Sequence, residues 1–113
     1  MDCIFCKIVD GSIPSNKVYE DDSVLAFTDL SPQAPVHVLI IPKQHITSAN
    51  DITSENSAVI AHIFEVAAVL ARQLGIDRDG YRIVNNCGDK AGQSVKHMHF
   101  HMLGGRDFTW PPG

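Results

Sequence analysis

Three histidines at alternate positions constrain the fold of this chain more than any other sequence feature. His97, His99 and His101 lie in the segment 95–103, where apolar residues separate them. A β-strand directs alternate side chains to opposite faces, so the pattern predicts a strand with three imidazoles on one face and core side chains on the other. Same-face neighbours on a strand lie roughly 7 Å apart, so the imidazoles are expected to form a row.

Length and composition predict one globular domain over residues 1–113, because 44% of the side chains are hydrophobic and can build a single core. The net charge of −4 argues against a nucleic-acid partner, which requires a basic stripe. No apolar stretch is long enough to span a membrane, and the N-terminus carries no signal pattern. The odd count of three cysteines favours the reducing cytoplasm over a secreted disulfide framework.

Four further apolar runs predict strands, which makes an α+β domain on an antiparallel sheet of about five strands. The first two of these runs form a hairpin through Asp21 and Asp22. Besides residues 95–103, the predicted strands cover residues 18–20, 24–27, 36–41 and 81–85.

One short and one long helix are predicted to accompany this sheet. The short helix covers residues 2–9, with Asp2 as a possible N-cap. The long helix covers residues 54–74, because apolar residues recur there at steps of three and four. Thr53 or Ser54 is its expected cap, and Gly75 suits the left-handed residue that follows a helix.

Three interpretations of the histidine row follow from its spacing. An incidental polar face is the least favoured, since three of the six histidines alternate here. A catalytic metal site is the second, although the third histidine lies too far along one strand, so that His37 or His45 would have to complete it. The third is chemistry at phosphorus, in which an imidazole attacks and a donor-rich loop holds the phosphate.

The loop before the histidines favours phosphorus chemistry. Gly92, Gln93 and Ser94 precede the row directly. Glycine reaches the dihedral angles that let successive backbone N–H groups form an anion nest, and Ser94 adds a hydroxyl donor. A turn that needs Gly92 for its geometry alone is the competing interpretation. The combination of this loop with alternating histidines makes a phosphate site the more specific prediction.

The segment 86–101 reads NCGDKAGQSVKHMHFH and resembles the signature of the histidine triad (HIT) superfamily. The resemblance extends over nearly the whole chain and is strongest to the Hint-type purine nucleoside phosphoramidase branch. Further stretches that carry it are Ile4-Phe5, residues 29–35 (DLSPQAP), residues 40–43 (IIPK), Gly104-Gly105-Arg106 and residues 110–113 (WPPG). In the fragile-histidine-triad branch, which hydrolyses dinucleoside polyphosphates, a Pro-Arg pair stands where Gly104 and Gly105 stand here.

The resemblance implies a covalent mechanism centred on His99. This residue resembles the nucleophile that attacks the α-phosphorus of a purine nucleoside phosphoramidate or adenylate, after which water releases the nucleoside monophosphate. His101 resembles the phosphate contact, and His37 the residue that helps to orient the nucleophile. The leaving amine needs a proton, which His101 or Ser94 would supply. Neutral imidazole is a good nucleophile near pH 7, so no cofactor is expected in the catalysis.

The resemblance also implies the nucleotide-binding positions. Asp29 matches the acid that hydrogen-bonds the ribose, and Trp110 belongs to a C-terminal segment that reaches the neighbouring active site. The apolar walls of the purine pocket match Ile4, Phe5, Ile8, Phe27 and Leu30. Contacts to the phosphate or the leaving group match Asn86, Gly92, Gln93, Ser94, His99 and His101.

Cys3 and Cys6 form a Cys-x-x-Cys pair, which by its spacing is half of a tetrahedral zinc site. The alternatives are core cysteines on a helix and a redox pair, although a thioredoxin-like motif follows a strand and this one opens the chain. His45 and His97 are the candidates for the missing ligands, because the chemistry does not need them. Some bacterial members of the resembled family bind zinc with this combination, so a structural zinc is expected.

The expected activity is therefore hydrolysis of purine nucleoside phosphoramidates and adenylates by a cytoplasmic enzyme. The alternatives are a dinucleoside polyphosphate hydrolase of the same superfamily and a nucleotide-binding regulatory module with weak catalysis. The presence of His99 argues against such a module. The resemblance implies the HIT fold and a homodimer whose sheets join into one. A small domain with a wide apolar stripe on its long helix agrees with a homodimer.

Overall fold

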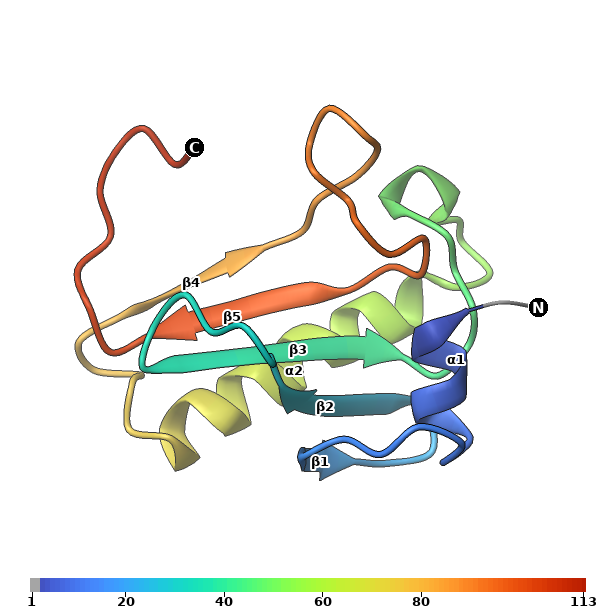
Figure 1. Cartoon of the computed structure of the whole chain (residues 1–113), viewed down its shortest axis with the longest axis horizontal. Helices are drawn as coiled ribbons and strands as arrows, with labels where there is room; N and C mark the ends of the chain where they lie inside the picture. Colours follow the sequence, from blue (N-terminus) through green and yellow to red (C-terminus); the bar gives the residue numbers. More distant parts are fainter. Residues whose placement is uncertain (1–2) are drawn as a thin grey trace.

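The structure is a computed structural model that describes residues 3–113, in which one antiparallel sheet forms the centre (Figure 1). The order of its strands is β1-β2-β3-β5-β4, so the last strand in sequence lies inside the sheet. The strands are β1 (Lys17–Glu20), β2 (Val24–Thr28), β3 (Val36–Pro42), β4 (Tyr81–Val84) and β5 (Phe100–Gly104). This arrangement confirms the predicted α+β class and the five-stranded antiparallel sheet.

Helical segments cover both sides of the sheet. They are α1 (Ile4–Val9), the short 3-10 helix η1 (Ala49–Asp51) and α2 (Ser57–Gln73). The long helix α2 runs behind the sheet in Figure 1, and α1 lies beside the start of β2 and the end of β3. Within residues 3–113, no helix has the length and apolar character needed to cross a membrane.

Alternate residues of the central strands build two separate cores. On β2, Val24 and Ala26 belong to the core that contains α2, whereas Leu25 and Phe27 belong to the core that contains α1. Because both faces of β2 are covered, its sequence is a continuous apolar run without polar alternation. The face toward α1 is the one on which the candidate site lies.

The histidine strand is shorter than predicted, since β5 begins at Phe100 and residues 95–97 form a bend. The ladder between β3 and β5 ends at the pair Ile40–Phe100. Two residues further along β3, Pro42 has no N–H group to donate, which prevents the ladder from continuing. The prediction of a strand over residues 95–103 is therefore wrong for the part before Phe100.

The alternation of faces holds beyond the end of the strand. Met98, Phe100 and Met102 are buried in the core that contains α2. The ring of His99 packs edge-on against Phe5 of α1, with 5.1 Å between the ring centres. The sequence pattern thus predicts which side chains share a face, even where it is wrong about the strand.

The long helix ends as predicted but begins later. Its N-cap is Asn56, so the expected caps Thr53 and Ser54 are wrong. The Asn56 side-chain oxygen accepts the Thr53 N–H at 2.7 Å, which closes a turn before the helix. At the other end Gly75 has a φ of +72°, the left-handed conformation expected of it.

A cysteine caps the short helix α1. Cys3 is the N-cap, and its Sγ accepts the backbone N–H of Cys6 at 3.2 Å. The predicted cap, Asp2, lies outside the described residues. Phe5 and Ile8 point from α1 into the core, so the helix joins the cysteine pair to the apolar face of the sheet.

An acidic side chain fastens the β1–β2 hairpin to α2. Asp21 accepts hydrogen bonds from the Tyr19 hydroxyl and from His62 Nε2, both at 2.6 Å. Burial disfavours the charged carboxylate, but these bonds and the N–H groups of Ser23 and Val24 outweigh it and hold the pKa of Asp21 below its usual range. The hydrogen bond to Asp21, followed by that to Glu65, raises the pKa of His62.

Replacement of Asp21 with asparagine is expected to lower the free energy of unfolding by about 1 kcal/mol, because a half-exposed ionic hydrogen bond is lost. The raised pKa of His62 means that its charged form stabilises the fold fully below pH 6.5, and that this contribution disappears as the pH rises through the raised value. Urea denaturation of the wild type and of Asp21→Asn at pH 6 and pH 9 measures this difference in the free energy of unfolding and its dependence on pH. Asp22→Asn, at the exposed neighbouring position, is the control and should change little.

Candidate functional site

A pocket of about 270 Å³ lies on the α1 side of the sheet. Apolar side chains line most of it, and two of the alternating histidines face into it. The predicted site residues in its lining are Ile4, Phe5, Ile8, Phe27, Asp29, Leu30, Ser94, His99 and His101. Further lining residues, which sequence reasoning missed, are Ile13, Pro14, Ser15, Asn16, Thr28, Leu39 and Val95.

One hydrogen bond determines which nitrogen of His99 is free. Its Nδ1 lies 2.8 Å from the carbonyl oxygen of His97, and a carbonyl only accepts, so Nδ1 carries the proton. In the neutral ring Nε2 then has a lone pair and no hydrogen. The Asn85 side chain donates to the His99 carbonyl at 2.9 Å and holds the backbone from the other side. His99 therefore has an unprotonated Nε2 in its neutral form, and its ring lines the pocket.

A second chain of hydrogen bonds orients His101. The backbone N–H of Gln33 donates to His37 Nδ1 at 3.0 Å, so the proton of neutral His37 is on Nε2. That proton is donated to His101 Nδ1 at 2.8 Å. His101 consequently carries its own proton on Nε2, as a donor available to an anionic group in the pocket. The Asp29 carboxylate lies 3.5 Å from His37 Nε2 and shares this polar cluster.

Burial keeps the imidazole rings of His37 and His101 neutral. It lowers the pKa of His101 to about 4, helped by the neighbouring imidazoles of His99 and His37. Burial also lowers the pKa of His37, although the charge of Asp29 opposes the effect. Neutral rings are what the hydrogen-bond chain requires, because each ring accepts on Nδ1 and donates from Nε2.

The depressed pKa of His101 predicts a loss of stability in acid. An unfolded histidine binds its proton near pH 6.5, whereas folded His101 binds it near pH 4, so the unfolded state holds more protons between these values. The free energy of unfolding should fall as the pH drops from 6.5 to 4, by on the order of 1–3 kcal/mol from this residue. In His101→Asn, denaturation midpoints should fall less steeply over the same window; an unchanged slope would contradict the assignment.

The glycine turn before the histidines uses its own N–H groups. Gly92 has a φ of +82°, and its N–H donates to the Asp89 carbonyl at 3.0 Å. The Gln93 N–H donates to the Gly88 carbonyl at 3.1 Å. The prediction of an anion nest from Gly92 and Gln93 is therefore wrong for these two groups, because the turn satisfies them internally. Ser94 is the member of the loop that lines the pocket.

Other predicted site residues lie apart from the pocket lining of their own chain. The Gln93 side chain is buried and donates to the Thr47 and Val95 carbonyls, which makes it an internal brace of the loop. Asn86 is half-buried and outside the lining. Trp110 is 82% exposed, so in the described chain it contributes nothing to the pocket.

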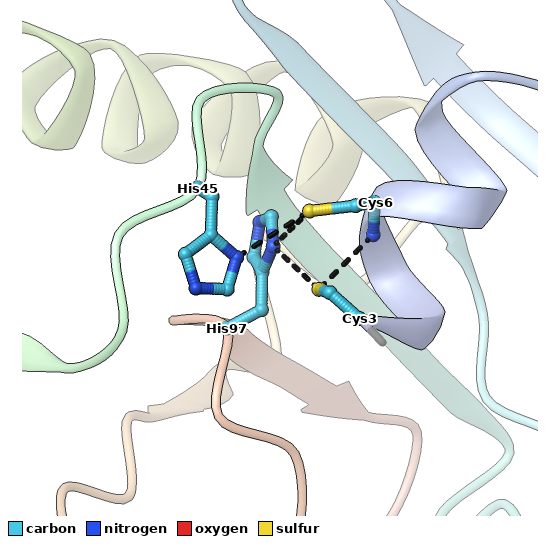
Figure 2. Close-up of side chains that lie close together, drawn as sticks. All are labelled: Cys3, Cys6, His45 and His97. Carbon is cyan, nitrogen blue, oxygen red and sulfur yellow. Dashed lines mark hydrogen bonds between the residues drawn. The ribbon is translucent and has the colours of Figure 1, made fainter. Parts of the chain in front are cut away.

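The predicted zinc ligands come together from three distant segments (Figure 2). Cys3 and Cys6 are at the start of α1, His45 follows β3, and His97 precedes β5. One ligand atom from each residue lies within 4.8 Å of every other. His97 Nδ1 is 3.3 Å from the Cys3 sulfur and 3.5 Å from the Cys6 sulfur, and His45 Nδ1 is 3.4 Å from the Cys6 sulfur.

The donor set fits a structural zinc. Two thiolates and two imidazoles fill four tetrahedral positions and leave none for an activated water. His97 Nε2 donates to the Pro42 carbonyl at 2.8 Å, which leaves Nδ1 unprotonated and directed at the sulfurs, as a metal ligand requires. Burial and the Cys3 thiol raise the pKa of Cys6 to about 11, so a bound cation is needed to keep its thiolate at neutral pH.

Comparison with known families agrees with this geometry. The family model described as the HIT domain matches residues 10–108. These include the three histidines of the candidate site, which are His37, His99 and His101, and the two histidines of the predicted zinc site. The chain belongs to the HIT domain family. Cys3 and Cys6 lie before the matched region, whereas their partners His45 and His97 lie inside it.

Three known proteins resemble the chain over almost its whole length. The crystal structure of a HIT family hydrolase from Legionella pneumophila has a TM-score of 0.97 and 50% identity, covering 99% of this chain and 100% of that one. A 14 kDa zinc-binding protein of Zea mays is 48% identical over 112 residues, which cover 97% of this chain and 87% of the relative. A histidine triad nucleotide-binding protein from Candida albicans has a TM-score of 0.83 and 36% identity, covering 97% and 83%.

Two contacts that orient the histidines of this HIT domain were missed by sequence reasoning. One is the amide of Asn85 on the His99 carbonyl, and the other is the Gln33 N–H on His37. Neither has a local sequence signal, because in each pair one partner is a backbone group that every residue possesses.

Proposed function

We propose that this protein hydrolyses purine nucleoside phosphoramidates and related adenylates through a covalent nucleotidyl-histidine at His99. The observation that carries the proposal is the hydrogen bond from His99 Nδ1 to the His97 carbonyl, which leaves Nε2 as a bare nucleophilic nitrogen in a pocket. A neutral imidazole attacks phosphorus without a metal or another activator.

The reaction divides into two displacements. His99 Nε2 attacks the α-phosphorus, the phosphorus–nitrogen bond breaks, and the leaving amine takes the proton of the Ser94 hydroxyl. Water then attacks the same phosphorus and returns a proton to Ser94, and the bond between His99 Nε2 and phosphorus breaks, which releases the nucleoside monophosphate and regenerates the imidazole. His101 Nε2–H serves both steps as a hydrogen-bond donor to the phosphoryl oxygens, where negative charge develops. His37, through its bond to His101 Nδ1, keeps that proton in place.

The pocket chemistry supports a purine nucleotide as the substrate. Phe5 and Phe27 meet edge to face with 5.6 Å between ring centres, and with Ile8 they offer an apolar wall for a base. Asp29 lies in the same lining and suits the ribose hydroxyls. The similarity to a HIT family hydrolase and to a nucleotide-binding protein supports the same assignment.

Zinc in this proposal is structural. Cys3, Cys6, His45 and His97 hold it, and when bound it supplies folding energy and no open coordination position. The similarity to a zinc-binding protein from maize supports this role. The chemistry is then left to His99, whose ring is not among the clustered ligand residues.

A homodimer in the cytoplasm completes the proposal. The exposed Trp110 and Phe64, the latter on α2, offer apolar surface for a second copy. Trp110 of one copy would reach the active site of the other. Sedimentation at micromolar concentration should give the mass of a dimer; a monomer would contradict this part of the proposal.

The branch is tested by comparing two substrates. A fluorogenic adenosine phosphoramidate should be hydrolysed faster than diadenosine polyphosphates under the same conditions. The expected reason is that Gly104 and Gly105 stand where the polyphosphate branch has a Pro-Arg pair. A much faster rate on the polyphosphate would reverse the branch assignment, and binding of AMP without turnover of either substrate would favour a regulatory module.

A further inference from the structure

We propose that Cys3 and Cys6 are a peroxide-sensitive pair, whose oxidation to a disulfide releases the zinc and weakens the nucleotide site. The two thiols belong to one turn of α1, and their sulfurs are in the same four-residue cluster (Figure 2). The proposed release of zinc is inferred from this cluster alone. The proposed weakening of nucleotide binding rests also on the proposed function.

The cluster is open to a small oxidant. A second pocket of about 480 Å³ is lined by Cys3 and His45, so it reaches the metal ligands directly. Cys6 is only half-buried and is therefore also accessible from outside the core. The third cysteine, Cys87, lies in the loop after β4 and is not part of the cluster. Hydrogen peroxide thus has a route to the pair that needs no unfolding of the sheet.

The spacing of the pair permits a bond. Cys3 is the extended N-cap of α1, and its sulfur already accepts the Cys6 N–H at 3.2 Å. A disulfide, which holds the two Cβ atoms about 3.8 Å apart, would close across the first turn of α1. That turn carries Ile4 and Phe5, which line the nucleotide pocket.

The chemistry balances with hydrogen peroxide as the oxidant. One thiolate attacks a peroxide oxygen, the oxygen–oxygen bond breaks, and a sulfenic acid forms with loss of hydroxide. The second thiolate attacks the sulfenic sulfur, forms the disulfide and expels a second hydroxide. Two protons from solvent convert the hydroxides to water. The sulfurs lose two electrons in total and are no longer thiolate ligands, so Zn²⁺ leaves with only two imidazoles to hold it.

His97 connects the metal cluster to the nucleophile. Its Nδ1 faces the sulfurs, its Nε2 donates to Pro42, and its carbonyl accepts the proton of His99 Nδ1. Phe5 packs edge-on against both His97 and His99, at 5.9 Å and 5.1 Å between ring centres. Loss of zinc therefore releases the residue whose carbonyl selects the reactive nitrogen of His99.

To test the proposal, the zinc-loaded protein is treated with hydrogen peroxide, and zinc release, disulfide formation and AMP affinity are measured. Released zinc is measured with a chromogenic chelator, the disulfide by peptide mass mapping, and AMP affinity by calorimetry. One zinc should be released for each Cys3–Cys6 disulfide, and AMP binding should weaken by roughly tenfold or more. A thiol reductant with added zinc should restore both.

Two variants make the test specific. Cys87→Ser retains the pair and should release zinc as the wild type does. Cys6→Asp supplies a carboxylate oxygen in place of the sulfur ligand but cannot form the disulfide, so its zinc should stay bound. Zinc retention by the wild type, or a disulfide that includes Cys87, would overturn the proposal even if Cys6→Asp fails to fold. Zinc release with unchanged AMP affinity would overturn the coupling alone. Absence of phosphoramidate hydrolysis would refute the proposed function and leave the zinc measurement valid.

Discussion

Replacement of His99 with alanine is expected to reduce turnover of an adenosine phosphoramidate by roughly a thousandfold or more, because the covalent route loses its nucleophile. AMP affinity should change by no more than about threefold, since the apolar walls and the remaining polar groups stay in place. Single-turnover kinetics and calorimetry on the same preparation measure the two quantities separately.

His62→Gln is the matched control for this variant. His62 is bonded to Asp21 and Glu65 and is absent from the lining of the nucleotide pocket, so its replacement should leave kcat unchanged. Zinc content should equal that of the wild type in both variants, which separates a chemical effect from a folding defect. Substantial turnover by His99→Ala would mean that another group attacks phosphorus.

Removal of zinc is expected to lower the melting temperature by about 10 °C or more. The reason is that the unfolded chain has no preformed zinc site, so the free energy of metal binding stabilises only the folded state. The four ligands tie α1 to the segments after β3 and before β5, so the loss should be largest at the N-terminal end. Calorimetric melting with and without a chelator measures the shift, and hydrogen exchange locates it.

Cys87→Ser supplies the control for the metal prediction, since this free cysteine lies outside the cluster. It should retain one zinc and melt like the wild type. Cys6→Ser should melt like the chelated protein. Elemental analysis that finds no zinc in protein purified without chelators would contradict the prediction. A zinc-dependent rate at a temperature where the metal-free protein is fully folded would mean that the metal is catalytic.

The faces of the histidine segment could be predicted from sequence, but the extent of its strand could not. Alternation of His99 and His101 with apolar residues depends only on the two-residue period of an extended chain. Where β5 begins depends instead on its neighbour, because the ladder stops where Pro42 of β3 lacks a donor. A partner strand far away in sequence decides this boundary.

The same distinction applies to the site. The Cys-x-x-Cys spacing predicts half of the zinc site, and histidine is the side chain that commonly completes such a site. His45 and His97 could therefore be named as ligands before the fold was known. The anion nest was predicted wrongly for Gly92 and Gln93, because the sequence shows that Gly92 permits a turn and does not show which N–H groups the turn uses for its own hydrogen bonds. The Asn56 cap was missed for a similar reason, since Thr53 and Ser54 are equally good caps by residue type.

The ring orientations of the histidines are the feature of the site that is hardest to predict from the sequence. A backbone carbonyl determines which nitrogen of His99 carries the proton, and a backbone N–H does the same for His37. Backbone groups are the same in every residue, so these contacts appear only when the chain is folded. They nevertheless determine which nitrogen attacks and which donates, and hence the chemistry proposed for this HIT domain.

The stereochemical course at phosphorus tests the covalent mechanism most directly. A purine nucleoside phosphoramidate with a chiral α-phosphorothioate is hydrolysed in isotopically labelled water, and the configuration of the product is determined. Attack by His99 followed by attack of water makes two in-line displacements, each of which inverts phosphorus, so the account predicts net retention. Net inversion would mean that water attacks the substrate directly, and would contradict a nucleotidyl-histidine intermediate.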